Sequence, residues 1–432
     1  MNKGTELYNK AKKIIPGGNQ FLSKRPEMFL PDKWPSYYSK ASGCQLWDLN
    51  NNKYIDMSIM GIGACSLGYA NPEVNNAVKK AIDNGSISTL NSYEEVELAE
   101  KLIDLHPYME MVRFARTGGE ANAIAIRIAR AVSRKSKVAI CGYHGSHDWY
   151  LSANLNGKNN LEGLLLSGLD PAGVPKELEG TTLPFHYGKI DELQMLVDKY
   201  DDIGVICIEV QRGEKADLPF LNEVRVIANQ INAVLIFDEI SSGFRLSVGA
   251  IYKLYNLEPD MVILGKALGN GFGISAILGK RDVMEAAQDC FISSSYWTER
   301  TGFAAALETI RQFEENDVID YLKMIGEYFR TKLEPVFTKH NIQISGKLTV
   351  PIMTYNIENP LLMKTVLTQE MMERGFLSSN IIYFSNKHTK NHIDYFCENM
   401  GELLEELNTE SLSGLSAKLT GEICHSGFNR LT

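Results

Sequence analysis

The stretch Phe237-Asp238-Glu239-Ile240-Ser241-Ser242-Gly243-Phe244-Arg245, followed further on by Gly265-Lys266-Ala267-Leu268-Gly269, decides the fold class of this chain. Each stretch begins at the end of an apolar run, Val234–Phe237 in the first case and Met261–Leu264 in the second. Short runs of this kind, rich in branched side chains, predict buried strands of a parallel sheet. We therefore expect Asp238 and Lys266 to lie at the carboxyl ends of neighbouring strands.

A carboxylate and a lysine at adjacent strand ends fit a site for pyridoxal 5'-phosphate. In such a site the lysine amine forms a Schiff base, and the aspartate keeps the pyridine nitrogen protonated so that the ring acts as an electron sink. Taken singly, a strand-ending aspartate is more often a helix cap, and a lysine after a strand is more often a solvated surface group. The spacing of Asp238 and Lys266, with glycines beside the lysine, favours the cofactor site.

These motifs closely resemble those of the class III (omega) aminotransferases of pyridoxal-phosphate fold type I, and especially the glutamate-1-semialdehyde 2,1-aminomutase branch. The resemblance covers nearly the whole chain. It implies an α/β fold, with a mostly parallel central sheet that has helices on both faces and a smaller α+β domain built from both chain ends. We accordingly expect residues 61–308 to form the large cofactor domain, and residues 1–60 and 309–432 to form the small domain.

The pattern along the chain agrees with this division. From residue 64 to about 307, short apolar strands alternate with amphipathic helices, which is typical of a parallel sheet covered on both faces. The helix after Gly119 has apolar residues spaced by three and four, from Ala121 to Val132. Gln45–Asp48 and Lys53–Asp56 predict a hairpin near the N-terminus. The strands expected in the large domain are Met111–Ala115, Val138–Cys141, Ile203–Ile208, Ala233–Phe237, Met261–Leu264 and Ser275–Leu278.

Composition sets the broad class. The 432 residues carry a formal charge of -9, which argues against a nucleic-acid partner, and no run of eighteen or more apolar residues predicts a membrane span. The first six residues lack the apolar core of a signal peptide, so we expect a cytoplasmic protein. The seven cysteines are scattered without a CxxC pair, which indicates reduced thiols and gives no support for a metal site.

Arg116-Thr117-Gly118-Gly119-Glu120-Ala121 lies between an expected strand and the periodic helix. Glycines there let backbone N–H groups approach a phosphate, and the helix N-terminus adds partial positive charge, although a simple strand-to-helix turn would have the same residues. The resembled family usually has Ser-Gly-Thr in this place. Thr117 and Gly118 match it in character, whereas Gly119 lacks the hydroxyl and leaves one phosphate hydrogen bond in doubt.

Further cofactor contacts are expected after other strands. Tyr143 in Gly142-Tyr143-His144-Gly145 matches the family residue that stacks on the pyridine ring, while His144 could equally bind a backbone carbonyl. Glu209 corresponds to a strand-end glutamate of the family that supports the site from behind. Ile240, two residues after Asp238, would pack on the ring face opposite Tyr143.

Two further sites depend on the resemblance. Thr298 is the counterpart of the family threonine that reaches across a homodimer interface to the neighbour's cofactor phosphate, although its Ser/Thr-rich surroundings could simply cap a helix. The segment that follows it, up to Phe303, departs from the family pattern and suggests a modified substrate entrance. After Pro16-Gly17-Gly18, the family's carboxylate-binding arginine aligns with Lys24, and Arg25 stands beside it; either could supply the charge, or both could be solvated loop residues.

These features predict a pyridoxal-phosphate-dependent aminotransferase that moves an amino group from a small amino donor to a small carbonyl metabolite, such as a keto sugar or a semialdehyde. The catalytic residues would be Lys266 and Asp238. An intramolecular aminomutase and a decarboxylating enzyme are the alternatives within the family. A non-catalytic binding scaffold is disfavoured because both Lys266 and Asp238 are present.

Overall fold

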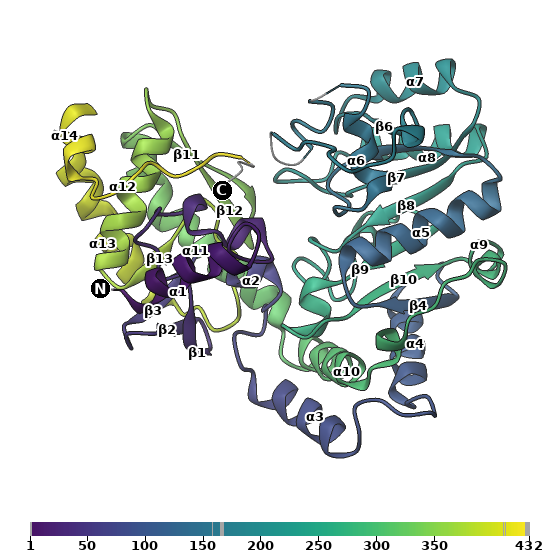
Figure 1. The fold of residues 1–432 in the computed structure, drawn as a ribbon, viewed down its shortest axis with the longest axis horizontal. Coiled ribbons are helices and arrows are strands. Elements are labelled where there is room, and N and C mark those ends of the chain that lie inside the picture. Colours follow the sequence, from purple (N-terminus) through teal and green to yellow (C-terminus); the bar gives the residue numbers. More distant parts are fainter. Residues whose placement is uncertain (1, 158, 165–167, 409, 411, 428–432) are drawn as a thin grey trace. The chain divides into compact units, whose positions relative to one another are not determined.

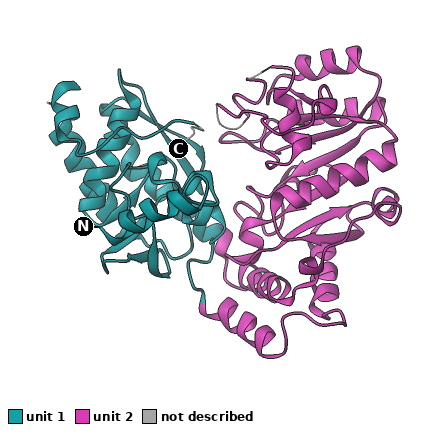
Figure 2. Ribbon diagram, viewed as in Figure 1, with its two compact units in different colours: residues 1–71, 320–432 teal, residues 72–319 magenta. Residues whose placement is uncertain are grey.

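The computed structural model describes residues 2–157, 159–164, 168–408, 410 and 412–427 (Figure 1). It divides into unit 1, which joins residues 1–71 to 320–432, and unit 2, the continuous range 72–319 (Figure 2). The resemblance to the family predicts these boundaries at 60 and 308. Residues 61–71 belong to unit 1 because Ser66 O accepts a hydrogen bond from Asn386 N, 2.9 Å away, and Tyr69 forms an antiparallel bridge with Gly43.

Unit 2 is built on a seven-stranded sheet of order β4-β10-β9-β8-β7-β5-β6. Its strands are β4 (Met111–Ala115), β5 (Lys137–Cys141), β6 (Thr182–Pro184), β7 (Ile203–Ile208), β8 (Val234–Asp238), β9 (Met261–Leu264) and β10 (Ser275–Gly279). Strands β5 to β9 pair in parallel, whereas β10 is antiparallel to both of its neighbours, β9 and β4. The mostly parallel sheet predicted from the sequence is therefore confirmed.

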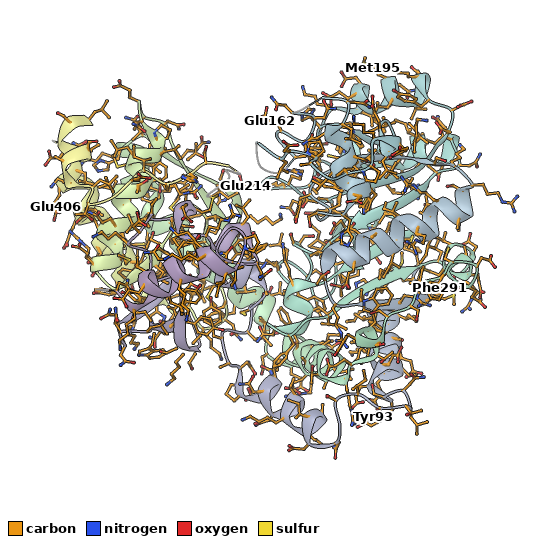
Figure 3. All side chains as sticks on the ribbon, in the orientation of Figure 1. Tyr93, Glu162, Met195, Glu214, Phe291 and Glu406 are labelled. Atoms are coloured by element: carbon orange, nitrogen blue, oxygen red, sulfur yellow. The ribbon has the colours of Figure 1, made fainter. Side chains whose placement is uncertain are left out.

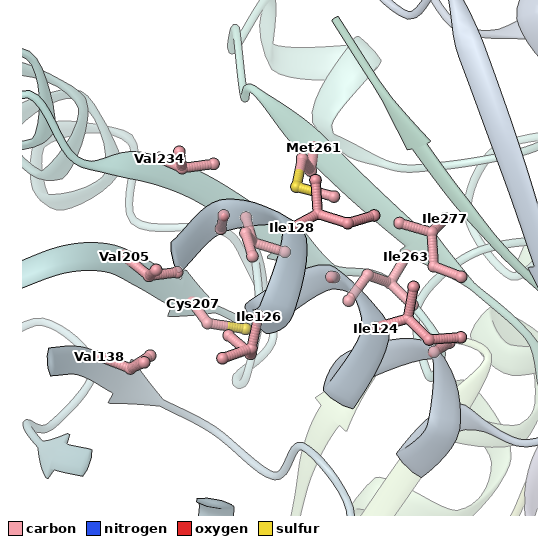
Figure 4. Close-up of a cluster of buried hydrophobic side chains, with 14 of the residues drawn as sticks. Ile124, Ile126, Ile128, Val138, Val205, Cys207, Val234, Met261, Ile263 and Ile277 are labelled. Carbon is pink, nitrogen blue, oxygen red and sulfur yellow. The ribbon is translucent and has the colours of Figure 1, made fainter. Parts of the chain in front are cut away.

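Helices cover this sheet (Figure 1). The helices of unit 2 are α3 (Pro72–Asp83), which packs on α10 and not on the sheet, α4 (Glu94–Leu105), α5 (Gly118–Ser133), α6 (Asp148–Leu151), α7 (Ile190–Lys199), α8 (Leu218–Gln230), α9 (Arg281–Met284) and α10 (Arg300–Glu315). The predicted amphipathic helix is α5, which has a buried apolar face and lies against the sheet. Its residues Ile124 and Ile128 meet Met261, Ile263 and Ile277 of the strands (Figure 4). This packing fixes the position of the helix and therefore of its first turn.

Strand β6 was not predicted. It is only three residues long, it ends in Pro184, and it pairs with β5 alone at the edge of the sheet. An edge strand this short shows neither a long apolar run nor a clear alternation, and proline is tolerated at edges because it has no N–H to donate. Its place in the sheet comes from the neighbouring strand β5.

Unit 1 joins the two ends of the chain in one four-stranded sheet of order β1-β2-β3-β13. Its strands are β1 (Tyr38–Ser42), β2 (Gln45–Asp48), β3 (Lys53–Met57) and β13 (Phe376–Ser378), beside a two-stranded sheet of β11 (Ile342–Lys347) and β12 (Val350–Tyr355). Its helices are α1 (Lys3–Ile14), α2 (Met60–Gly63), α11 (Val318–Lys339), α12 (Pro360–Glu373), α13 (Lys390–Leu407) and α14 (Leu412–Lys418).

Strands β2 and β3 form the predicted hairpin. Strand β13 pairs in parallel with β3, so residues more than three hundred positions apart share one sheet. Phe376 of β13 and Phe396 of α13 are both fully buried with ring centroids 5.3 Å apart, which ties this sheet to the C-terminal helices. In the part of the chain that the structure describes, no helix combines the length and the apolar character needed to cross a membrane.

Candidate active site

Lys266 and Asp238 lie at the carboxyl ends of adjacent strands. Asp238 is the last residue of β8 and pairs with Ile263 of β9, and Lys266 begins the short 3-10 turn that follows β9. The Nζ of Lys266 donates a hydrogen bond to Ser241 Oγ at 2.5 Å, three residues beyond Asp238. The turns after β8 and β9 therefore meet at one edge of the sheet, where ligands bind in folds of this kind.

The carboxylate of Asp238 is only 3% exposed and is held from three directions. Its Oδ2 accepts a hydrogen bond from Asn122 Nδ2 at 2.9 Å and lies 2.8 Å from His144 Nδ1, while its Oδ1 accepts from Ile240 N at 3.0 Å. These contacts come from α5, from the loop after β5 and from the turn after β8. They fix the orientation of the carboxylate in a region from which water is largely excluded.

Asn122 was not predicted from the sequence. It lies one turn into α5, where its side-chain amide also donates to Gly118 O at 3.0 Å. The signal that could have found it is a polar residue on the apolar, buried face of an amphipathic helix, since such a group needs a partner within the protein. In this structure that partner is Asp238.

His144 is fully buried against Asp238 and Cys207. Burial by itself lowers the pKa of the imidazole, but the neighbouring Cys207 and the hydrogen bond to Asp238 outweigh it and raise the pKa well above its usual value. Burial likewise raises the pKa of the Cys207 thiol. The sequence left open whether His144 binds a backbone carbonyl, and the structure places its Nδ1 on the Asp238 carboxylate. The charged imidazolium is thus favoured beside a carboxylate.

Two glycines leave space for neighbouring side chains at this edge of the sheet, Gly118 for Ile240 and Gly265 for Ser275. A Cβ atom built at Gly118 would lie 2.8 Å from Ile240 Cδ1, and one at Gly265 would lie 2.9 Å from Ser275 Oγ and 3.5 Å from Ile240 Cγ2. Lys266 itself has a φ of 47°, in the left-handed region that residues other than glycine rarely adopt. Such local strain is typical of functional sites, where the surrounding structure imposes it.

The first turn of α5 lies at the same edge, because β4 runs in the same direction as β9. Thr117 forms a capping box with Glu120: its hydroxyl accepts from Glu120 N at 3.3 Å and donates to the Glu120 carboxylate at 3.0 Å. The N–H groups of Gly118 and Gly119 have no hydrogen-bond partner within the described residues. Two such donors at the N-terminus of a 16-residue helix point the way an anion requires, which keeps the predicted phosphate contact of Gly118 and Gly119 a prediction.

Tyr143 and Glu209 follow β5 and β7 at this edge. Tyr143 is 37% exposed, and burial together with the charge of Asp238 raises the pKa of its phenol. Glu209 forms an ion pair with Arg212 at 2.9 Å and packs against Gly142, where a Cβ would lie 2.8 Å from Glu209 Cγ. Glu209 therefore supports the loop that carries Tyr143.

The remaining predicted residues lie in other segments. Thr298 ends the short 3-10 turn Ser295–Thr298 of unit 2, and its hydroxyl donates to Ser295 O at 2.8 Å. Lys24 is exposed and Arg25 is half-buried, with the Arg25 guanidinium filling the space beside Gly17. Both basic residues belong to unit 1, whereas Lys266 and Asp238 belong to unit 2.

The profile of the class-III aminotransferases matches residues 31–404 of this chain. The chain belongs to the class-III aminotransferase family. The 3-aminobutyryl-CoA aminotransferase of Cloacimonas acidaminovorans is 30% identical over 423 residues, which cover 94% of this chain and 97% of that protein. The glutamate-1-semialdehyde 2,1-aminomutase of Methanothrix thermoacetophila is 33% identical over 358 residues, 80% of each chain.

A solved structure has the same fold. This structure is the FumI protein of Sphingopyxis sp. MTA144 in its pyridoxal-phosphate internal aldimine form. It superposes on this chain with a TM-score of 0.86 at 23% sequence identity, and the superposition covers 97% of this chain and 100% of that chain. The predicted family and the fold type I architecture are confirmed, and this class-III aminotransferase is a pyridoxal-phosphate-dependent enzyme. Its residues fit the cofactor, because Lys266 Nζ and the buried Asp238 carboxylate lie at one edge of the sheet and the first turn of α5 presents unbound N–H groups within the described residues.

Proposed function

We propose that this protein is an aminotransferase that moves an amino group from a small-molecule donor to a small carbonyl metabolite, such as a keto sugar or a semialdehyde. The observation that carries the proposal is the position of Lys266 Nζ, held by Ser241 at the carboxyl edge of the sheet beside the buried carboxylate of Asp238. A strained lysine next to a carboxylate fixed in its orientation is the pair that this chemistry requires.

The residues that would hold the cofactor come from five segments around that edge. Lys266 would attach it through Nζ, and Asp238 would bind its pyridine nitrogen. Tyr143 and Ile240 would cover opposite faces of the ring, with Glu209 and His144 behind it. The phosphate would lie at the start of α5, on the residues Thr117, Gly118 and Gly119.

When bound, pyridoxal 5'-phosphate supplies an electron sink for the carbon that carries the amino group. Lys266 Nζ would act as the general base that removes the proton from that carbon. The hydroxyl of Ser241 orients this amine at a distance of 2.5 Å. Asp238 would hold the proton on the pyridine nitrogen, and the orientation of its carboxylate is fixed by Asn122, His144 and Ile240 N.

An intramolecular 2,1-aminomutase is the second candidate, since relatives with that name are as similar to this chain as the aminotransferases are. Two departures from the aminomutase pattern favour transfer between molecules. The segment from Thr298 to Phe303 differs from it, and Lys24 stands where the aminomutases have a carboxylate-binding arginine. Lys24 or Arg25 would bind the substrate carboxylate in either case, but only Arg25 offers two parallel hydrogen bonds.

We also propose that the active unit is a homodimer in which Thr298 reaches the cofactor phosphate of the partner subunit. Unit 2 presents bulky apolar side chains to solvent: Phe291 is 88% exposed, Leu90 81% and Tyr93 60%, and Figure 3 shows Tyr93 and Phe291 on its surface. Arg300 joins the two segments that carry them, because its N donates to Ser86 O at 2.8 Å and its guanidinium lies over the Tyr93 ring. Large apolar side chains that are exposed in the single chain would gain burial at such an interface.

The central test is chemical. Borohydride reduction of the protein with its cofactor, followed by peptide mapping, is expected to place the label on Lys266. The variant Lys266→Ala should remain folded, bind the cofactor without a covalent bond and show no turnover. Label on another lysine, or on none, would remove the basis of the proposal.

The second test separates transfer from mutation. A panel of amino donors, including alanine, glutamate and a 3-amino acid, is scored by the absorbance change of the bound cofactor. An aminotransferase needs an added carbonyl substrate to complete its cycle, whereas an aminomutase turns over with one substrate alone. Turnover without any added carbonyl compound would favour the aminomutase.

A further inference from the structure

The first turn of α5 has two backbone donors for a phosphate but few side-chain donors. Gly118 and Gly119 have no side chain, and the hydroxyl of Thr117 is already bound to Glu120 in the capping box. A phosphate on this turn would therefore meet N–H groups and little else from the turn itself. An additional donor has to come from another segment.

The imidazole of His147 occupies the place of the missing side chain at residue 119. A Cβ atom built at Gly119 would lie 2.8 Å from both Nδ1 and Cε1 of His147, and the next nearest atom, Gly145 Cα, would be 3.8 Å away. His147 is the residue before α6, but its side chain does not cap that helix and forms no hydrogen bond to the described residues. Its exposed ring is thus available to a ligand at this turn.

The backbone holds His147 in this position. Gly145 has a φ of 109°, and a Cβ there would lie only 2.8 Å from Gly119 Cα, so two glycines let the loop after β5 pack directly on the start of α5. His147 O accepts hydrogen bonds from Tyr150 N at 2.9 Å and from Leu151 N at 3.1 Å, and Tyr150 Oη donates to Gly142 O at 2.9 Å. These hydrogen bonds hold the backbone of the loop in place at Gly142, before the histidine, and at His147 itself.

We propose that His147 binds the cofactor phosphate and donates the hydrogen bond that residue 119, being glycine, does not supply. The inference rests on the proposed function in one respect, namely that the phosphate lies on the first turn of α5. Gly119 and His147 then act as a pair. The glycine leaves the space, and the imidazole fills it and faces the anion beside the N–H groups of Gly118 and Gly119.

The test compares two ligands that differ only in the phosphate. Dissociation constants of pyridoxal 5'-phosphate and of pyridoxal are measured on apo-protein by fluorescence quenching, for the parent chain and for His147→Ala. Loss of a hydrogen bond to a charged group should raise the constant for the phosphorylated ligand about tenfold or more. The constant for pyridoxal should change by less than about twofold. Ser146→Ala, a change at the neighbouring exposed residue, is the matched control and should alter neither constant.

Repeating the measurement in a chain that also carries Gly119→Thr makes the test specific to residue 119. In Gly119→Thr the new side chain displaces the imidazole, whose ring is free to rotate toward solvent, and the threonine hydroxyl supplies the donor. His147→Ala should then change the constant for pyridoxal 5'-phosphate by less than about twofold in that background. Thermal denaturation of the apo-proteins verifies that each variant is folded.

Three results would overturn the role of His147: an equal loss of affinity for both ligands, no loss for either, or the same loss in the Gly119→Thr background as in the parent. The first would assign His147 to the shape of the loop alone. Failure of the proposed function is seen separately, as borohydride labelling away from Lys266, because the comparison of the two ligands requires no turnover and no covalent attachment.

Discussion

Replacing Asp238 by asparagine removes the carboxylate while keeping the size of the side chain. In the structure, Asp238 accepts from Asn122 Nδ2 and Ile240 N and lies 2.8 Å from His144 Nδ1. An asparagine amide has one acceptor oxygen and one donor group, so in either orientation its NH₂ faces at least one of these donors. It also leaves the buried His144, whose pKa is raised by its surroundings, without a negative partner.

Two magnitudes follow from this geometry. Loss of one buried hydrogen bond to a charged group should lower the free energy of unfolding by about 1.5–3 kcal/mol. Loss of the negative charge that holds the pyridine proton should remove about 4 kcal/mol of transition-state stabilisation, which corresponds to roughly a thousandfold in rate. The rate effect is therefore expected to exceed the structural one, and the two can be measured separately.

The assay is the half-reaction with a single amino donor, followed by absorbance in a stopped-flow instrument at saturating cofactor. Asp260→Asn is the matched control, because Asp260 precedes β9 at the opposite edge of the sheet, where it pairs with Arg225 at 2.8 Å. The control should have a rate within about twofold of the parent chain. An Asp238→Asn rate within about tenfold of the parent, with the cofactor bound, would refute the assigned role.

Three further predictions follow. Asn122→Ala removes the amide donor 2.9 Å from Asp238 Oδ2 and should slow the same half-reaction about tenfold; an unchanged rate would remove Asn122 from the site. Burial lowers the pKa of His388 from 6.5 to about 4, so the unfolded chain takes up its proton first as the pH falls. The free energy of unfolding should therefore drop by about 2–3 kcal/mol for this group between pH 7 and 4.5, and urea titrations of His388→Gln should show a correspondingly shallower dependence unless the assignment is wrong. Thr298→Ala should weaken cofactor binding by about 1.5–3 kcal/mol, and mixing it with Lys266→Ala chains should restore one intact site per heterodimer; a fully active monomer in sedimentation would contradict this.

The sequence by itself determined six of the seven strands of the large sheet, all except the edge strand β6, and the positions of the residues that end them. The apolar runs before Asp238 and Lys266 are short, branched and without alternation, because strands buried on both faces have no polar side. A buried strand ends where its apolar run ends. The local pattern alone therefore places Asp238 and Lys266 at the carboxyl edge of the sheet. The family was recognisable for the same reason, because its motifs are the residues of these turns.

Only the tertiary structure decided which side chains meet at that edge. Asn122 donates a hydrogen bond to Asp238, and His144 Nδ1 contacts the same carboxylate. The ring of His147 occupies the space beside Gly119. Each of these contacts joins segments that are far apart in the chain or lie on different turns, and each depends on strand order and on the rotation of α5 about its axis. A local pattern shows which face of a helix is buried, but the partner that a buried polar group finds there is set by the packing of the whole sheet.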